Sequence, residues 1–248
     1  MTLGGKSLAG RAALITGSAA GIGQTLAIAL AQAGASVAGV DVDEQAETAR
    51  KVAELGGSFL ALSADVTDPA AIKAACDTAA GELGKLEIVV ANAGIYPVTP
   101  FDTVTYEEWR RIMTVNLDGT FLTVQAALPH LKQAGWGRIV VISSGSIWIG
   151  IPTLVPYITS KAGLIGFTRA LAAEIGEFGI TVNAITPGLT ETETAVSVFD
   201  DWGVVEEQIV KRRQQPGDLV SALLFLCDPG SGFITGQTVN VDGGKAKH

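Results

Sequence analysis

Seven short apolar segments recur along the chain, and they restrict its possible folds more than any other feature. Each is four or five residues long and rich in apolar or β-branched residues, and most lack the alternation of a half-exposed strand. That pattern is typical of strands buried on both faces, as in a parallel sheet. The segments are residues 12–16, 36–40, 58–62, 86–90, 138–142, 180–184 and 238–241.

Helix-length segments with helical spacing separate these predicted strands, at residues 22–34, 44–55, 69–83, 105–134 and 156–178. Regular alternation of strands and helices favours βαβ units. The predicted fold class is therefore α/β: a doubly wound Rossmann fold, with a seven-stranded parallel sheet and helices on both faces. No linker or repeat interrupts the pattern, so we expect a single domain over residues 1–248. Residues at about 190–215 lack a clean period, and we expect them to form a segment that covers the substrate.

Charge and hydropathy exclude several classes of function. The formal net charge is −8, and no basic cluster is longer than Lys211-Arg212-Arg213, which argues against nucleic-acid and membrane partners. No apolar run reaches the ~18–20 residues of a membrane span, and the first residues do not resemble a signal peptide. We therefore expect a cytoplasmic protein.

Cysteine and histidine are too sparse for metal or triad chemistry. Cys76 and Cys227 stand far apart in apolar helical contexts and are predicted to be buried reduced thiols. The two histidines, His130 and His248, are poorly placed for a zinc site or a Ser-His-Asp triad. No metal is expected, and any proton chemistry must use other residues.

A glycine-rich turn follows the first predicted strand and precedes a helix. Gly17 permits the tight turn, Gly21 lets the backbone approach a pyrophosphate, and Gly23 lets helix and sheet pack closely. Asp41 ends the next strand, 18 residues after Gly23, and its carboxylate can accept hydrogen bonds from both ribose hydroxyls while repelling a 2′-phosphate. This predicts NAD rather than NADP, although Asp41 could instead open a turn.

Asp65 and Val66 follow the third predicted strand and are candidates for holding the adenine ring. The alternative is that Asp65 or Asp68 caps the next helix, and both roles could coexist.

Tyr157 and Lys161 stand four residues apart in a helical stretch, so they lie on one face of the helix. A nearby ammonium stabilises a phenolate and lowers its pKa from about 10 towards working pH. A general acid/base for an alcohol/carbonyl couple needs that property. Taken alone, either residue could equally be structural.

Together these motifs resemble the short-chain dehydrogenase/reductase family, and the resemblance covers essentially the whole chain. Five motifs appear in the family's order: Thr16-Gly17-x-x-x-Gly21-Ile22-Gly23, Asn92-Ala93-Gly94, Asn116, Ser144 with Tyr157-x-x-x-Lys161, and Pro187-Gly188. The resemblance implies an NAD-dependent oxidoreductase that moves a hydride to or from a small substrate, usually as a homotetramer. Stretches such as residues 92–97 and 233–238 are similar to bacterial NAD-linked alcohol dehydrogenases, including those for 1-phenylethanol and pyridoxal.

The resemblance also implies catalytic roles. Tyr157 would exchange a proton with the substrate oxygen, and Lys161 would tune it and hold the nicotinamide ribose. Asn116 would anchor a water of the proton relay. Among three nearby serines, the family's spacing of thirteen residues before the tyrosine selects Ser144 to polarise the substrate oxygen, and Ser146 is left as a second substrate contact.

The remaining expected contacts are with cofactor and substrate. The predicted cofactor-binding residues are Gly17, Ala20, Gly21, Ile22, Gly23, Asp41, Asp65, Val66, Asn92, Ala93, Gly94, Tyr157, Lys161, Pro187, Gly188, Thr190 and Thr192. The predicted substrate residues are Tyr96, Ser146, Trp148, Leu189 and Trp202. Most of this second set is apolar or aromatic, which favours a small hydrophobic or aryl secondary alcohol or ketone.

Two positions depart from the commonest family pattern: Ala91 stands where a second asparagine is usual, and Thr190 where Ile or Val is common. Two rival functions remain. One is an NADPH-dependent 3-oxoacyl reductase of the same fold, which Asp41 disfavours. The other is a dinucleotide-binding regulator without turnover, which the presence of Asn116, Ser144, Tyr157 and Lys161 disfavours.

Overall fold

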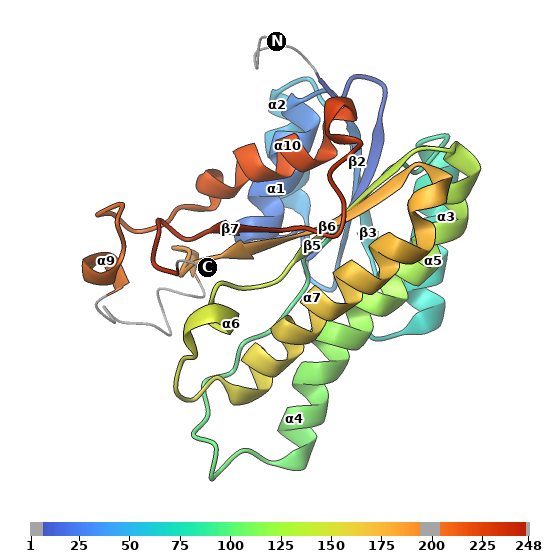
Figure 1. Cartoon of the computed structure of the whole chain (residues 1–248). Helices are drawn as coiled ribbons and strands as arrows, with labels where there is room; N and C mark the ends of the chain where they lie inside the picture. Colours follow the sequence, from blue (N-terminus) through green and yellow to red (C-terminus); the bar gives the residue numbers. More distant parts are fainter. Residues whose placement is uncertain (1–6, 194–203, 247–248) are drawn as a thin grey trace.

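The computed structural model describes residues 7–193 and 204–246, and its strands form one parallel sheet in the order β3-β2-β1-β4-β5-β6-β7 (Figure 1). The strands are β1 (Ala12–Thr16), β2 (Ser36–Asp41), β3 (Phe59–Ser63), β4 (Ile88–Ala91), β5 (Gly137–Ile142), β6 (Ile180–Pro187) and β7 (Thr238–Val241). Strands β1, β4, β5 and β6 are buried along their whole length, as expected for a sheet covered on both faces. The predicted fold class and strands are confirmed, although β6 runs on to Pro187 instead of ending at Ala184.

Helices cover the two faces of the sheet in two layers (Figure 1). One layer contains α1 (Gly21–Gln32), α2 (Ala46–Glu54) and α10 (Val220–Cys227). The other contains α3 (Pro69–Glu82), α5 (Gly119–Ala134) and α7 (Val155–Ile175). Two short helices, α6 (Ser146–Ile149) and α9 (Val204–Glu207), lie near the carboxyl ends of β5 and β6. The sequence indicated helix α10 only through the helical context of Cys227 and gave it no bounds.

The segment predicted as one helix over residues 105–134 is interrupted. It consists of α4 (Tyr106–Met113), a π-helical turn over Thr114–Asp118, and α5. A π-helical turn accommodates one extra residue and often marks a functional site. Asn116 lies in the middle of this turn and is fully buried. The prediction of an uninterrupted helix was therefore wrong, because the spacing of apolar residues does not reveal the local widening.

The carboxyl ends of the strands bring the candidate site together. The strand order reverses between β1 and β4, which are adjacent in the sheet but distant in the chain. Open α/β sheets bind ligands outside the carboxyl ends of strands at such a switch point. Gly17, Asn92, Ser143 and Gly188 each follow directly after one of the four strands β1, β4, β5 and β6.

Three further expectations concern the rest of the chain. Cys76 and Cys227 are free and buried, as predicted, and burial raises the pKa of each thiol to about 12. No helix within residues 7–193 and 204–246 has the length and apolar character needed to cross a membrane. Of the segment expected to cover the substrate, residues 194–203, and with them Trp202, lie outside the described residues.

Candidate active site

The glycine-rich loop between β1 and α1 needs its glycines for different reasons. Gly17 and Gly21 have φ angles of +69° and +57°, in the left-handed region that favours glycine. A Cβ atom on Gly23 would lie 1.8 Å from the carbonyl oxygen of Gly17, so no side chain fits there. A Cβ atom on Gly21 would lie 3.3 Å from the methyl group of Thr192, which places the segment after β6 directly over this loop.

Asp41 serves the loop as well as the turn that follows it. One carboxylate oxygen accepts a hydrogen bond from Ala19 N at 2.8 Å, and the other accepts one from Asp43 N at 3.1 Å. The turn foreseen as an alternative role is therefore present. Each carboxylate oxygen can accept more than one hydrogen bond, so capacity remains for a ribose hydroxyl.

Asn92 and Thr16 join the end of β4 to the same loop. The Asn92 side-chain amide donates to Thr16 O at 3.0 Å and to Gly17 O at 3.1 Å. The Thr16 hydroxyl in turn accepts hydrogen bonds from the backbone N–H groups of Asn92 and Ala93. Asn92 thus holds the loop in shape through its side chain.

Buried residues of α2 and the turn before it hold the loop from its other side, and sequence reasoning missed them. Gln45 accepts a hydrogen bond from the Ser18 hydroxyl at 2.7 Å, and the Thr48 hydroxyl donates to Ser18 O at 2.8 Å. Both Gln45 and Thr48 are buried. A polar residue at the start of an amphipathic helix is usually solvated, so the sequence carries no signal for this role.

The helix cap expected as an alternative at Asp65 or Asp68 is present, and the adenine-binding role of Asp65 and Val66 stays a prediction. Asp65 is exposed and accepts hydrogen bonds from the backbone N–H and hydroxyl of Thr67. The cap of α3 is Asp68, which accepts from Ala70 N and Ala71 N. Val66 is buried in the apolar core between the sheet and α3 and α5.

A cleft of about 1110 Å³ lies along the carboxyl edge of the sheet. The predicted site residues that line it are Gly17, Ala20, Gly21, Ile22, Gly23, Asn92, Ala93, Gly94, Tyr96, Ser144, Ser146, Tyr157, Lys161, Pro187, Gly188, Leu189, Thr190 and Thr192. The predicted residues that are described but do not line it are Asp41, Asp65, Val66, Asn116 and Trp148. The glycine-rich loop and the Tyr157–Lys161 pair therefore share one cavity.

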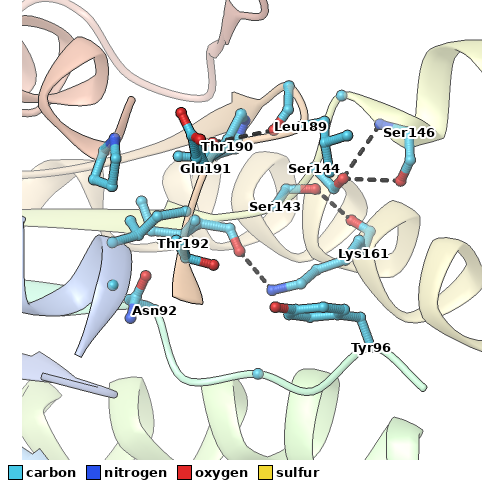
Figure 2. Close-up of a pocket in the computed structure, with 18 of the residues that line it drawn as sticks. Asn92, Tyr96, Ser143, Ser144, Ser146, Lys161, Leu189, Thr190, Glu191 and Thr192 are labelled. Carbon is cyan, nitrogen blue, oxygen red and sulfur yellow. Dashed lines mark hydrogen bonds between the residues drawn. The ribbon is translucent and has the colours of Figure 1, made fainter. Parts of the chain in front are cut away.

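Lys161 is held from several directions in the centre of this cleft. Its ammonium donates to Ile142 O at 2.8 Å, and its backbone carbonyl accepts from the Ser143 hydroxyl at 2.7 Å (Figure 2). Its Nζ atom lies 6.0 Å from the centroid of the Tyr157 ring. A Cβ atom on Gly94 would lie 3.2 Å from Nζ, so Gly94 leaves the room that the ammonium occupies.

The pKa of Tyr157 is shifted in the direction opposite to the one predicted. Burial raises the pKa of the phenol, a hydrogen bond from Ser144 lowers it, and the nearby Tyr96 raises it. Burial also lowers the pKa of Lys161 to about 8. The net shift of the Tyr157 pKa is upward, because the phenol and the ammonium lose hydration in the same cavity and that loss disfavours either charge.

Asn116 positions the backbone beside this centre instead of facing the cleft. Its side-chain oxygen accepts from Ile95 N at 2.8 Å, and its side-chain nitrogen donates to Ile95 O at 2.9 Å and to the Ser160 hydroxyl at 3.0 Å. Ser160 also donates to Tyr157 O at 2.7 Å. Sequence reasoning missed Ser160, although its place three residues after Tyr157 put it on the same helix face.

Ser144 and Ser146 form a buried pair at the other side of the cleft. Their hydroxyl oxygens lie 2.8 Å apart, and Ser146 N donates to the Ser144 hydroxyl oxygen at 3.2 Å (Figure 2). Both side chains are more than nine-tenths buried.

The wall next to Tyr157 is apolar. Leu154 is buried among Tyr96, Ile151, Tyr157 and Leu189, with Ile158 completing the cluster. The rings of Tyr96 and Tyr157 meet edge to face with centroids 6.0 Å apart. Ile149, Ile151 and Leu154 line the cleft, and none of the three was a predicted substrate residue.

Thr190 presents its backbone to the cleft despite its unusual side chain. It pairs with Gln214 in an isolated parallel bridge, and Glu191 N donates to Gln214 O at 2.8 Å. In such a bridge the central residue directs its own N–H and C=O away from the partner. The bridge to Gln214 therefore does not use the N–H and C=O groups of Thr190.

These features fit a nicotinamide dinucleotide. The glycines leave a cradle beside the N-terminus of α1, a location suited to a pyrophosphate. From there the cleft extends past Gly94 to Tyr157 and Lys161.

Comparisons with known proteins agree with this geometry. A family model described as enoyl-(acyl carrier protein) reductase matches residues 17–246. The (2S)-[(R)-hydroxy(phenyl)methyl]succinyl-CoA dehydrogenase subunit of Thauera aromatica is 37% identical over 95% of this chain and 96% of its own. Carveol dehydrogenase from Mycobacterium avium, solved in complex with NAD, superposes with a TM-score of 0.91 at 31% identity, covering 96% of this chain and 98% of its own.

A short-chain type dehydrogenase/reductase from Mycobacterium marinum superposes with a TM-score of 0.92 at 34% identity, covering 97% of each chain. The chain belongs to the short-chain dehydrogenase/reductase family, as its motifs predicted. It is an oxidoreductase of that family.

Proposed function

We propose that the protein transfers a hydride between NAD and a small hydrophobic or aryl secondary alcohol or its ketone. One observation carries the proposal. Around Tyr157, the described lining of the cleft combines an apolar cluster of Leu154, Ile151 and Leu189 with the hydroxyl groups of Ser144, Ser146 and Tyr96. A wall of this kind suits a substrate with one reacting oxygen and an apolar body.

The chain's own residues have distinct tasks in alcohol oxidation. Tyr157, as phenolate, takes the proton from the substrate hydroxyl, and Ser144 donates a hydrogen bond to the same substrate oxygen. Lys161, fixed by Ile142 O, stabilises the phenolate as a nearby cation. Bound NAD supplies the hydride acceptor at its nicotinamide ring. Asn116 acts indirectly, by holding the backbone at Ile95.

The choice of NAD over NADP rests on Asp41. Its carboxylate ends β2 and already accepts a hydrogen bond from the glycine-rich loop, so a 2′-phosphate at this place would meet a fixed negative charge. Carveol dehydrogenase, at 31% identity, was solved with NAD, which supports the same choice.

The substrate class also draws support from relatives. The substrate named for the Thauera aromatica relative contains a hydroxy(phenyl)methyl group. In such a group a secondary alcohol stands on the carbon that bears the phenyl ring. A rival is supported by 3-oxoacyl-[acyl-carrier-protein] reductase of Salmonella typhimurium, which is 34% identical over 96% of this chain. We further propose a cytoplasmic homotetramer, on the basis of family membership alone.

The test is NADH formation from NAD, with NADP in parallel, on 1-phenylethanol, aliphatic secondary alcohols, sugars and 3-hydroxyacyl thioesters. We expect turnover of 1-phenylethanol or a related aryl alcohol with NAD, and loss of that turnover in Tyr157→Phe. Turnover of 3-hydroxyacyl thioesters with NADP alone would favour the reductase. Tight NAD binding without a rate above that of Tyr157→Phe on any substrate would favour a binding protein.

A further inference from the structure

The Ser144 hydroxyl lies within a fixed hydrogen-bond environment. A hydroxyl group carries one proton to donate and two lone pairs that accept. The N–H of Ser146 donates to the Ser144 oxygen at 3.2 Å and so engages one lone pair. The Ser146 hydroxyl oxygen lies 2.8 Å away, and either hydroxyl can be the donor in that second contact. The direction of this bond decides where the Ser144 proton points.

The two directions have different chemical consequences. If Ser144 donates to Ser146, its proton is used within the pair and cannot reach Tyr157 or a substrate oxygen. If Ser146 donates to Ser144, both lone pairs of Ser144 are engaged and its proton must point elsewhere, towards the cleft. Among the described residues the buried Ser146 hydroxyl has Ser144 as its hydrogen-bond partner, so only donation from Ser146 gives the Ser146 proton an acceptor.

The backbone around Ser146 keeps the pair in place. Gly145 N donates to Pro187 O at 2.7 Å, and a Cβ atom on Gly145 would lie only 3.0 Å from that oxygen. Ser146 begins α6, and its carbonyl accepts from Gly150 N at 2.9 Å. With this backbone fixed and the side chain buried, the hydroxyl of Ser146 has little freedom to turn away from Ser144.

We propose that Ser146 is a positioning residue that donates its hydroxyl proton to Ser144, so that the Ser144 proton is directed at the Tyr157 oxygen and at the reacting oxygen of the substrate. This differs from the role expected from the sequence, in which Ser146 contacts the substrate itself. The proposal rests on the proposed alcohol oxidation, but its central contact belongs to the protein alone and can be tested without turnover.

The first test is a double-mutant cycle on NAD-dependent oxidation of 1-phenylethanol, with Ser144→Ala, Ser146→Ala and the double variant. We expect Ser146→Ala to lower kcat about tenfold, the factor that corresponds to ~1.4 kcal/mol, with little change in KM. The double variant should be no slower than Ser144→Ala, because Ser146 acts through Ser144. Ser146→Thr keeps the hydroxyl and should recover most of the rate.

The pH profile adds a signature that a purely structural serine would not change. The rate of oxidation rises with pH as Tyr157 loses its proton. Weaker donation from Ser144 raises the pKa of Tyr157, so the midpoint of kcat/KM should move to higher pH in Ser146→Ala. Ser231→Ala is the matched control, because it removes a buried hydroxyl bonded to Phe225 O outside the cleft, and its midpoint should stay unchanged.

The second test needs no substrate. The chain has three tyrosines, so ¹³C-tyrosine labelling gives few signals, and Tyr157→Phe identifies the one of interest. The Tyr157 Cζ signal should move in the same direction in Ser146→Ala as in Ser144→Ala, and should not move in Ser231→Ala.

An unmoved Tyr157 signal in Ser146→Ala, alongside a moved one in Ser144→Ala, would overturn the proposal while leaving the proposed function intact. The proposal would also be overturned if the losses of rate in the double-mutant cycle were additive and Ser146→Ala mainly raised KM. That result would restore Ser146 as a substrate contact. If the Tyr157 Cζ signal moves in both serine variants but the protein oxidises no alcohol, the positioning role of Ser146 is retained and the proposed function is refuted instead.

Discussion

Replacing Lys161 with methionine is expected to abolish turnover and to make the protein more stable at neutral pH. Lys161 is 4% exposed, and the carbonyl of Ile142 accepts a hydrogen bond from its ammonium. Burial lowers its pKa from the ordinary value of 10.5 to about 8. At about 1.4 kcal/mol per pH unit, this difference corresponds to a cost to folding of roughly 3 kcal/mol. Methionine is close in length and carries no charge.

Part of that gain is offset. Removing the ammonium leaves the Ile142 carbonyl without this donor, which costs about 1–3 kcal/mol if the group stays dry. The net stabilisation of Lys161→Met at pH 7 is therefore expected to lie between about 0 and 2 kcal/mol. The pH dependence is the sharper expectation, because the offset does not change with pH.

The sign follows from proton binding. Between pH 8 and 10.5 the unfolded chain holds the Lys161 proton more tightly than the folded protein, so the wild type gains stability as pH rises through this window. The advantage of Lys161→Met should therefore be greatest below pH 8 and shrink by about 2–3 kcal/mol towards pH 10.

Urea unfolding at pH 7 and at pH 10, at one fixed protein concentration, measures this difference. Lys73→Met is the matched control. It makes the same substitution at a lysine whose side chain is 68% exposed to water. A difference between wild type and Lys161→Met that is the same at both pH values would refute the reasoning, whatever its size.

Three further predictions concern the glycine-rich loop, the cofactor and the π-helical turn. Gly23→Ala places a Cβ atom 1.8 Å from Gly17 O and should sharply lower both the melting temperature and NAD affinity. Gly81→Ala, in α3 with open space around it, should instead gain about 0.5–1 kcal/mol; equal melting temperatures for the two variants would contradict this packing argument. Asp41→Asn should improve NADPH relative to NADH in kcat/KM by about tenfold or more, because it removes a charge worth ~1.4 kcal/mol; an unchanged ratio would remove Asp41 from cofactor choice. Asn116→Ala should lower kcat by roughly tenfold to a hundredfold by releasing Ile95, as loss of two or more hydrogen bonds would; a wild-type kcat in a folded variant would exclude that role.

The sequence predicted the framework well because the signals involved are local or periodic. Strands buried on both faces leave continuous apolar runs, and helices leave a period near four, so the parallel sheet and its flanking helices could be inferred without coordinates. The glycines at 17, 21 and 23 could be interpreted in the same way, since a turn between strand and helix has few solutions. Helix α10 was given no bounds because its residues are apolar on most sides, which hides the helical period.

Contacts between distant segments could not be inferred. The π-helical turn around Asn116 leaves no periodic trace, and the bond from Asn116 to Ile95 joins residues 21 positions apart. Gln45 and Thr48 look like solvated helix residues until α2 is packed against the glycine-rich loop. The upward pKa of Tyr157 likewise depends on how much water the surrounding elements exclude, which no spacing of residues records.

The sequence by itself thus determined the fold class, the family and the chemical types gathered at the carboxyl edge of the sheet. Local backbone preference and hydrophobic period are encoded within short windows of residues, and they suffice for those conclusions. Only the tertiary structure decided which hydroxyl groups form hydrogen bonds with each other. It showed that the Lys161 ammonium donates to the Ile142 carbonyl and that the Ser146 hydroxyl lies within hydrogen-bond distance of Ser144. These relations depend on ångström-scale distances between segments brought together by folding, and hydration and hydrogen bonding at a site follow from such distances alone.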